Sequence, residues 1–326
     1  MLRKVQTKTS ASLLYSNLSC NGKCMAYVHN VEVIIAPDNS VFSGNPTPAV
    51  VRLPVKDEAV VKQARFIEMG GTDYLVVAGQ RALQIYTGDG KKCIHVQPVL
   101  DPGTAEAPSF FRGLAGATAG GGDFVCAGTS SGEIALLACI DGSFGHPVIL
   151  KEPGTAICDL DAAPYPENPD ECLLASADSD GQLLLLMVGP GGSCGAYASF
   201  GGDPNALCTA LRLRKQWLLT AYCTGHVRLY DVLSKSLVVQ VTAHARWINA
   251  LDVHPTKDVF ATAAEDCVVS VWQLPEASHA PQLKHLSAVV VPDALLCGVG
   301  FAGGAARDHV VSSAYDVDVL HSFALE

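Results

Sequence analysis

The sequence predicts an all-β fold in which seven four-stranded blades form a ring, a β-propeller. Two observations predict it. A unit consisting of an apolar strand, a polar turn and a second, alternating strand recurs along the whole chain. Its spacing of 42 to 51 residues is close to the length of one propeller blade, about 40–50 residues. The chain of 326 residues therefore holds seven units, and no room is left for a second domain.

The turn residue of each unit defines the spacing. These residues are Asn30, Gln80, Ser131, Asp180, Thr224, Asp266 and Asp316, and the intervals are 50, 51, 49, 44, 42 and 50 residues. Strands and turns at this interval, without helical periodicity, favour radial repetition over a sandwich. Clusters of proline and glycine, such as 101–108 and 189–195, interrupt the strands between units. We therefore expect a single propeller domain over residues 1–326.

The N-terminal segment is the candidate for closing the ring. Strand edges at the first and last blades stay exposed until the two ends of the chain pair. The segment from Thr9 to Tyr15 precedes the first unit, and the last unit lies close to the C-terminal end of the sequence. We expect residues 9–15 to pair as the outer strand of the blade that contains Val310 to Leu320.

The composition excludes several classes of protein. The chain has 22 basic and 32 acidic residues, a formal charge of −10, so it lacks the excess of Lys and Arg that binding to nucleic acid requires. It has no run of 18 apolar residues, so no membrane insertion is expected. Apolar residues make up 49% of the chain and charged residues 17%, and this balance is typical of many buried strands rather than of disorder.

The cysteines indicate the compartment. Twelve cysteines are spread along the chain, most of them inside apolar strands, and no Cys-x-x-Cys pair occurs. The N-terminal residues lack the apolar stretch of a secretory signal. Buried thiols that act as small apolar side chains explain this pattern. We therefore expect an intracellular, cytoplasmic protein with reduced cysteines.

The sixth unit carries the most specific motif. Ala243-His244 opens it, a turn with Pro255 follows, and the strand at Thr262, the turn at Asp266 and Trp272 complete it. This order resembles the WD-repeat (WD40) family, which implies a WD40 propeller and a hydrogen-bonded tetrad of His244, Thr262, Asp266 and Trp272. In that arrangement Asp266 accepts from His244, which faces the Thr262 hydroxyl, and Thr262 accepts from the indole N–H of Trp272.

The other units depart from this pattern. Leucine stands at the tryptophan position at Leu137 and Leu186, while Tyr230 and Thr224 replace tryptophan and aspartate in the fifth unit. His244, Thr262 and Asp266 could also be interpreted as a nucleophilic triad, but the blade pattern already explains all three residues. No metal-ligand spacing and no phosphate-binding loop occurs. We therefore expect no catalytic residues, no metal and no cofactor.

Arg246 and Trp247 are the candidate protein-binding residues. They lie in the loop just after His244, where WD-repeat proteins turn from the top loop into the innermost strand. Arg and Trp are also the residue types most enriched at binding hot spots. These two residues predict a contact surface at one end of the ring.

A closer resemblance to one family of WD-repeat proteins rests on scattered segments: 16–19, 111–115, 124–132, 243–246 and 296–298. It implies a non-enzymatic scaffold that binds other proteins in a larger intracellular assembly, with signalling scaffolds and the axoneme of the cilium or flagellum as the associated settings; self-association stays open. Two alternatives remain. A peptide- or modification-reading adaptor requires an aromatic or acidic cage on the top face, and a propeller enzyme requires an acidic or histidine cluster in the central channel.

Overall fold

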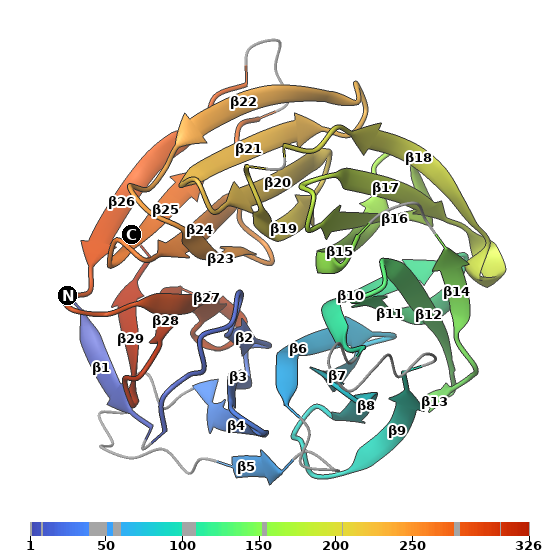
Figure 1. Ribbon diagram of the computed structural model, residues 1–326, viewed down its shortest axis with the longest axis horizontal. Coiled ribbons are helices and arrows are strands. Elements are labelled where there is room, and N and C mark those ends of the chain that lie inside the picture. Colours follow the sequence, from blue (N-terminus) through green and yellow to red (C-terminus); the bar gives the residue numbers. More distant parts are fainter. Residues whose placement is uncertain are drawn as a thin grey trace.

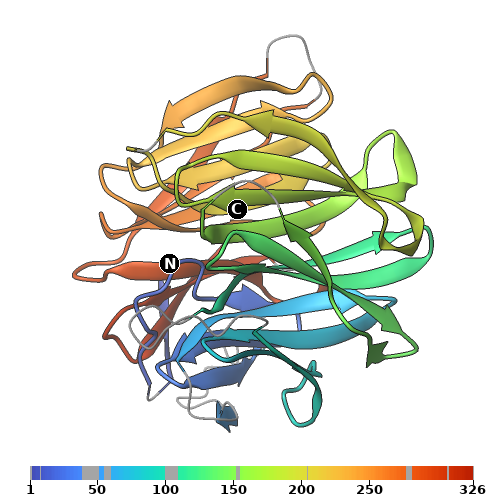
Figure 2. The same cartoon turned by 45° about the vertical axis from the view of Figure 1, so that its right-hand side comes forward.

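The fold is a ring of seven antiparallel sheets around a central channel (Figure 1). The computed structural model describes residues 2–7, 9–38, 51–54, 60–99, 109–151, 155–203, 205–276, 281–306 and 308–325. The ring confirms the sequence prediction of an all-β, seven-bladed propeller. Seen obliquely, the blades are twisted sheets that fan around the axis (Figure 2), as the right-handed twist of paired strands requires.

Each blade starts with a strand at the channel and ends at the rim. The first three blades are β2 (Ser19–Cys20), β3 (Cys24–His29), β4 (Glu32–Pro37) and β5 (Val51–Pro54); β6 (Val61–Met69), β7 (Thr72–Gly79), β8 (Ala82–Thr87) and β9 (Cys93–Pro98); and β10 (Phe111–Ala119), β11 (Gly122–Thr129), β12 (Glu133–Ile140), with β13 (Ser143–Phe144) and β14 (Val148–Lys151) both paired to β12.

The next three blades repeat the same order. They are β15 (Ile157–Tyr165), β16 (Asn168–Asp178), β17 (Leu183–Val188) and β18 (Cys194–Phe200); β19 (Cys208–Arg214), β20 (Trp217–Tyr222), β21 (His226–Asp231) and β22 (Ser236–Thr242); and β23 (Ile248–Val253), β24 (Val259–Ala264), β25 (Val268–Gln273) and β26 (Lys284–Val290). Blade 7 combines β27 (Leu296–Ala302), β28 (His309–Ala314) and β29 (Val319–Ala324) with β1 (Arg3–Gln6) from the other end of the chain. Two short 3-10 turns, η2 (Pro190–Gly192) and η3 (Gly304–Ala306), are the helical elements of the described residues.

The hydrophobic core lies between the blades rather than within them. Each of seven buried clusters joins side chains from two neighbouring blades, and the seven clusters together follow the whole ring. In blades 5 and 6, for example, Leu219 and Phe260 pack in one cluster. An isolated blade would expose both of its apolar faces, so each blade depends on its two neighbours for burial.

The closing strand is β1, not the segment at residues 9–15. β1 pairs antiparallel with β29, Arg3 opposite Ser322 and Val5 opposite Leu320. Val5 is 6% exposed and belongs to the core that the last blade shares with the first. Within residues 9–15, the contact with the last blade is a single parallel bridge from Ala11 to Tyr315. The principle of closure by the N-terminal segment holds, but its predicted position was wrong.

The segment after β1 crosses from the rim to the channel. The Ser16 N–H donates to the Asn249 carbonyl of blade 6 at 2.8 Å, and the Asn17 N–H donates to the Cys297 carbonyl of blade 7 at 2.9 Å. The Asn17 side chain accepts from the N–H of Val28 in blade 1 at 2.7 Å and donates to its carbonyl at 3.1 Å. These bonds explain why residues 9–15 do not form the outer strand: the chain is drawn inward to connect three blades.

None of the twelve cysteines forms a disulfide. Burial raises the pKa of Cys158 and of Cys172 to about 11, so both thiols are protonated and unreactive near neutral pH. In the described part of the chain, no helix has the length and apolar character needed to cross a membrane.

Acidification should destabilise the ring at its closing strand. His321 on β29 lies opposite Lys4 on β1, and burial together with the nearby Lys4 charge lowers the pKa of His321. Burial likewise lowers the pKa of His244. As the pH falls through about 6.5, these histidines become protonated in the unfolded chain, while in the folded protein they stay neutral to a lower pH. The unfolded state therefore binds more protons, and the free energy of unfolding decreases.

Urea unfolding at pH 7.5 and pH 5.5 measures this effect. The wild type should be less stable at pH 5.5, and His321→Gln should show a smaller difference between the two pH values. The lowered pKa values of Asp89, to about 2, and of Asp308 act below pH 4 and do not interfere. An equal pH dependence in the wild type and in His321→Gln would contradict the assignment to His321.

Candidate functional site

The two ends of the central channel differ in chemistry. Every blade repeats the same strand order, so the first residues of the inner strands gather at one end and their last residues at the other. The first end, which we call the channel mouth, also carries the loops that enter each blade. Between the two ends, charged side chains of the inner strands cross the channel.

This belt of charges consists of two arginines and three aspartates. Arg65 donates to Asp161 at 2.6 Å. Arg212 donates to Asp159 at 2.9 Å and to Asp252 at 3.5 Å. The belt therefore connects inner strands of blades 2, 4, 5 and 6.

The aspartates of the belt also bind backbone. Asp159 accepts the Leu211 N–H at 3.1 Å, and Asp161 accepts the Leu213 N–H at 2.8 Å. Burial alone would lower the pKa of Arg212, but the surrounding carboxylates raise it, so the guanidinium stays charged. The carboxylates of Asp159 and Asp161 are thus each held by an arginine and a backbone N–H, an arrangement that connects blades.

The channel mouth holds a cavity of about 360 Å³, within the size range of ligand sites. Its apolar walls are Leu13, Leu14, Tyr15, Phe110 and Trp247, and its polar walls are Lys62, Arg112, Asn249 and Glu265. Trp247, one of the two predicted contact residues, is 43% exposed. Arg246 is exposed beside it but does not line the cavity, so the structure brings only Trp247 into this site.

Each of the two cations that line the mouth lies over an aromatic ring. The rings of Tyr15 and Trp247 are 6.5 Å apart between centroids. The Arg112 guanidinium lies 4.9 Å from the centroid of Tyr15, and Lys62 Nζ lies 4.8 Å from that of Phe110. Such stacking holds a cation in place while its N–H groups remain available. The site thus has fixed positive charges beside an exposed indole.

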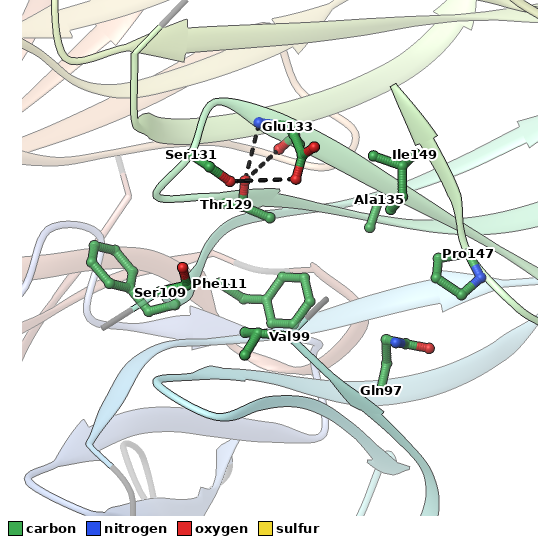
Figure 3. A pocket seen from close by; sticks show the side chains of 11 residues that line it. Gln97, Val99, Ser109, Phe111, Thr129, Ser131, Glu133, Ala135, Pro147 and Ile149 are labelled. Carbon is green, nitrogen blue, oxygen red and sulfur yellow. Dashed lines mark hydrogen bonds between the residues drawn. The ribbon is translucent and has the colours of Figure 1, made fainter. Parts of the chain in front are cut away.

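Two of the other cavities are less suited to a macromolecular ligand. The opposite end of the channel has a polar cavity of about 180 Å³ that Arg65, Arg212 and Asp252 line, and these side chains already belong to the belt. A crevice between blades 2 and 3 is shown in Figure 3, with Phe111 and Val99 on one side and Ile149 on the other. It has space for about 10 Å³, enough for one water molecule.

Three of the four residues of the predicted tetrad, His244, Thr262 and Asp266, are hydrogen-bonded to one another. His244 Nδ1 lies 3.0 Å from Asp266 Oδ1 and 3.1 Å from Oδ2, and His244 Nε2 lies 2.8 Å from Thr262 Oγ1. Burial lowers the pKa of His244 despite the opposing effect of Asp266, so the ring is neutral near pH 7. In the tautomer that fits, Nδ1–H donates to Asp266 and the Thr262 hydroxyl donates to Nε2.

Trp272 does not complete the tetrad as predicted. Thr262 lies opposite Ser270 in the sheet, whereas Trp272 lies opposite Phe260. The indole stacks on Phe260 with centroids 6.3 Å apart and meets the His285 ring at 4.8 Å. Among the residues that the structure describes, its Nε1 has no hydrogen-bond partner. The predicted bond to Thr262 is therefore wrong, and aromatic packing holds the ring instead.

The turn at Glu265 and Asp266 positions the loop that carries Trp247. Asp266 accepts the Ala245 N–H at 2.9 Å, and the next contact along the same turn is the Glu265 N–H, which donates to the Trp247 carbonyl at 2.9 Å. Gly225 of the neighbouring blade packs closely against this loop. It has a φ of +79°, and a Cβ there would lie 2.2 Å from the His244 carbonyl oxygen, so a glycine is required at this position. The exposed indole is thus fixed by its backbone.

Asp266→Ala should lower the free energy of unfolding by about 1–3 kcal/mol, because it leaves the buried His244 donor without an acceptor. It should also loosen residues 244–247, since the Ala245 N–H loses its acceptor too. Thermal unfolding measures the first effect, and hydrogen exchange of this loop measures the second. Asp180→Ala, at the equivalent turn of blade 4, exposed and with an ordinary negative φ, is the control. A variant that unfolds and exchanges like the wild type would show that the bond between Asp266 and His244 does not stabilise this blade.

Sequence reasoning missed Tyr15, Lys62 and Arg112. Each lies in a different blade-entry segment, and only the ring brings them together with Trp247. The available signal was the position of Lys62 and Arg112, each the second residue of its inner strand, β6 and β10. Across the described residues, no group of three or more His, Cys, Asp or Glu side chains could hold a metal ion.

Comparison with known proteins agrees with this architecture. The family model described as WDR54 matches residues 2–325. The chain belongs to the WDR54 family. WD repeat-containing protein 54 of Mus musculus is 28% identical over 338 residues, covering 98% of both chains. WD repeat-containing protein 54 of Homo sapiens is 27% identical, covering 99% of this chain and 98% of its own. The family resemblance predicted from the sequence is thereby confirmed.

The WDR54-family chain also resembles solved propellers. A chain in a structure titled "Crystal Structure of Mitotic Checkpoint Complex" superposes with a TM-score of 0.72 at 14% identity, covering 99% of this chain and 95% of that one. At this identity the likeness concerns the fold alone. It matches the ring seen in Figure 1.

Proposed function

We propose that this WD-repeat propeller is a non-enzymatic scaffold that binds a partner protein at the channel mouth. The observation that carries the proposal is Trp247. Its indole is 43% exposed at the edge of a cavity of about 360 Å³, on a backbone that the turn at Glu265 and Asp266 holds in place. An ordered, exposed tryptophan beside a concave surface is typical of a binding hot spot.

The belt of ion pairs supports a scaffold over an enzyme. A general acid or base must be free to exchange a proton with its substrate. In the channel, the carboxylates of Asp159 and Asp161 each bind an arginine and a backbone N–H. The same contacts connect several blades, which gives them a structural role that explains their presence.

The alternative of a reader for methylated or otherwise cationic side chains has one point in its favour, the cluster of Tyr15, Phe110 and Trp247 at the mouth. However, Arg112 and Lys62 already stack on Tyr15 and Phe110. Their positive charges would repel a cationic ligand, so we favour a partner of different chemistry.

Affinity purification from cells tests the proposed scaffold. Tagged wild type and the double variant Arg246→Ala/Trp247→Ala would be compared by mass spectrometry of the proteins that co-purify. We expect the variant to keep its thermal stability and to lose its main partners. Leu237→Ala/Lys284→Ala removes an exposed apolar side chain and a cation from the rim and is the matched control. Equal recovery of all partners by both variants would contradict docking at the mouth.

The setting of the assembly is a separate part of the proposal. Twelve cysteines that lie mostly within strands and form no disulfide support a reducing compartment such as the cytoplasm. A ciliary or flagellar assembly is the specific setting that the family resemblance suggests. Imaging of the tagged protein in ciliated cells tests it, with concentration along the axoneme as the expected result and an even cytoplasmic distribution as the contrary one.

A further inference from the structure

The channel mouth has an unbalanced positive charge in an acidic protein. Lys62 and Arg112 are its two cations, and Glu265 is the one carboxylate among the described residues that line it. The chain as a whole has a formal charge of −10. A local excess of cations on such a background is a distinct feature of this surface.

These two cations lack the partners that the other inner-strand arginines have. Arg65 and Arg212 are each bound to aspartates of the belt. Among the described residues, neither Lys62 nor Arg112 forms an ion pair. Both lie against aromatic rings instead, which fixes their position.

The apolar part of the mouth lies next to these charges. Leu13 is 51% exposed and Trp247 is 43% exposed, and both line the same cavity as Lys62 and Arg112. Carboxylates are the natural partners of a guanidinium, whose fork of N–H groups matches the two carboxylate oxygens. A ligand that satisfies both halves of the mouth therefore has an acidic group beside an apolar one.

We propose that the channel mouth binds a short acidic segment of the partner protein, in which carboxylates pair with Arg112 and Lys62 and a neighbouring apolar side chain packs against Trp247 and Leu13. The proposal rests on the proposed function and specifies its partner. The cavity of about 360 Å³ accommodates two or three side chains rather than a folded domain. The rest of the partner would lie over the surrounding loops.

A phage-displayed library of random 12-residue peptides, panned on the immobilised full-length protein, tests this. The wild type should enrich peptides in which Asp or Glu flanks Leu, Ile, Phe or Trp. Lys62→Gln/Arg112→Gln should bind the selected peptides at least tenfold more weakly. Lys91→Gln/Lys92→Gln removes the same two charges from the exposed hairpin between β8 and β9 and should bind them like the wild type.

Two further measurements identify the contacts. The emission of Trp247 should shift to the blue on peptide binding, since Trp217 and Trp272 are already buried. Raising the salt concentration from 50 to 500 mM should weaken binding to the wild type more than to Lys62→Gln/Arg112→Gln, because screening acts on the ion pairs.

Selection of no peptides, or of peptides without an acidic excess, would overturn the acidic partner. The failure of this proposal is distinguishable from failure of the scaffold. If Arg246→Ala/Trp247→Ala loses its cellular partners while the library shows no acidic preference, the docking surface stands and the acidic segment is wrong. If the partners are also retained, both are wrong.

Discussion

Arg212→Leu should lower the free energy of unfolding by about 3–5 kcal/mol, the cost of removing one partner from a buried ion pair. Arg212 is 6% exposed, and its guanidinium binds Asp159 at 2.9 Å and Asp252 at 3.5 Å. Leucine fills part of the space but leaves the buried Asp159 carboxylate without a cation. Chemical and thermal unfolding of the full chain measure the loss.

A surface pair is the control for this variant. Lys23 binds Asp73 at 2.7 Å between the first two blades, but its side chain is largely exposed, so Lys23→Ala should cost far less than Arg212→Leu. Adding Asp159→Asn to Arg212→Leu should recover part of the stability, because a neutral amide needs no counterion. Equal losses from Arg212→Leu and Lys23→Ala would show that the belt does not stabilise the ring.

The belt also shows which part of the structure the sequence could predict. Strand and turn spacing defines the seven blades, because each blade is a local unit of 42 to 51 residues. The pairs of the belt join residues 53 and 96 positions apart, so no local pattern indicates them. The signal that existed was the alternation of Asp159 and Asp161 in an otherwise apolar strand, since charges in a buried strand require partners.

The sequence predicted the contacts of His244, Thr262 and Asp266 correctly, but it misplaced the Trp272 ring and the closing strand. His244, Thr262 and Asp266 could be placed because the motif fixes their spacing, whereas the direction of the Trp272 ring depends on Phe260 and His285 beside it. The closing strand Arg3–Gln6 is short and has one buried side chain. Its hydrophobic pattern is weaker than that of Leu13 to Tyr15, whose apolar side chains line the channel mouth instead.

Val5→Asp should open the ring at its closing strand. Val5 is the buried side chain of β1, in the core shared by the last and first blades. A carboxylate has no partner there, so we expect the free energy of unfolding to fall by about 2–4 kcal/mol. Hydrogen exchange should become faster along β29, whose outer edge loses the four-residue pairing with β1.

The same variant should weaken binding at the channel mouth, because residues 12–17 follow β1 and carry Leu13 and Tyr15 into the cavity. Gln6→Asp is the matched control: it places the same charge on the exposed side of β1 and should leave stability, exchange and binding close to those of the wild type. If Val5→Asp and Gln6→Asp unfold alike and β29 exchanges at the wild-type rate, β1 does not hold the ring closed. If β29 exchanges faster while binding is unchanged, closure holds but the wall of the mouth is independent of it, since the bonds of Ser16 and Asn17 to blades 6 and 7 would then suffice to position Tyr15.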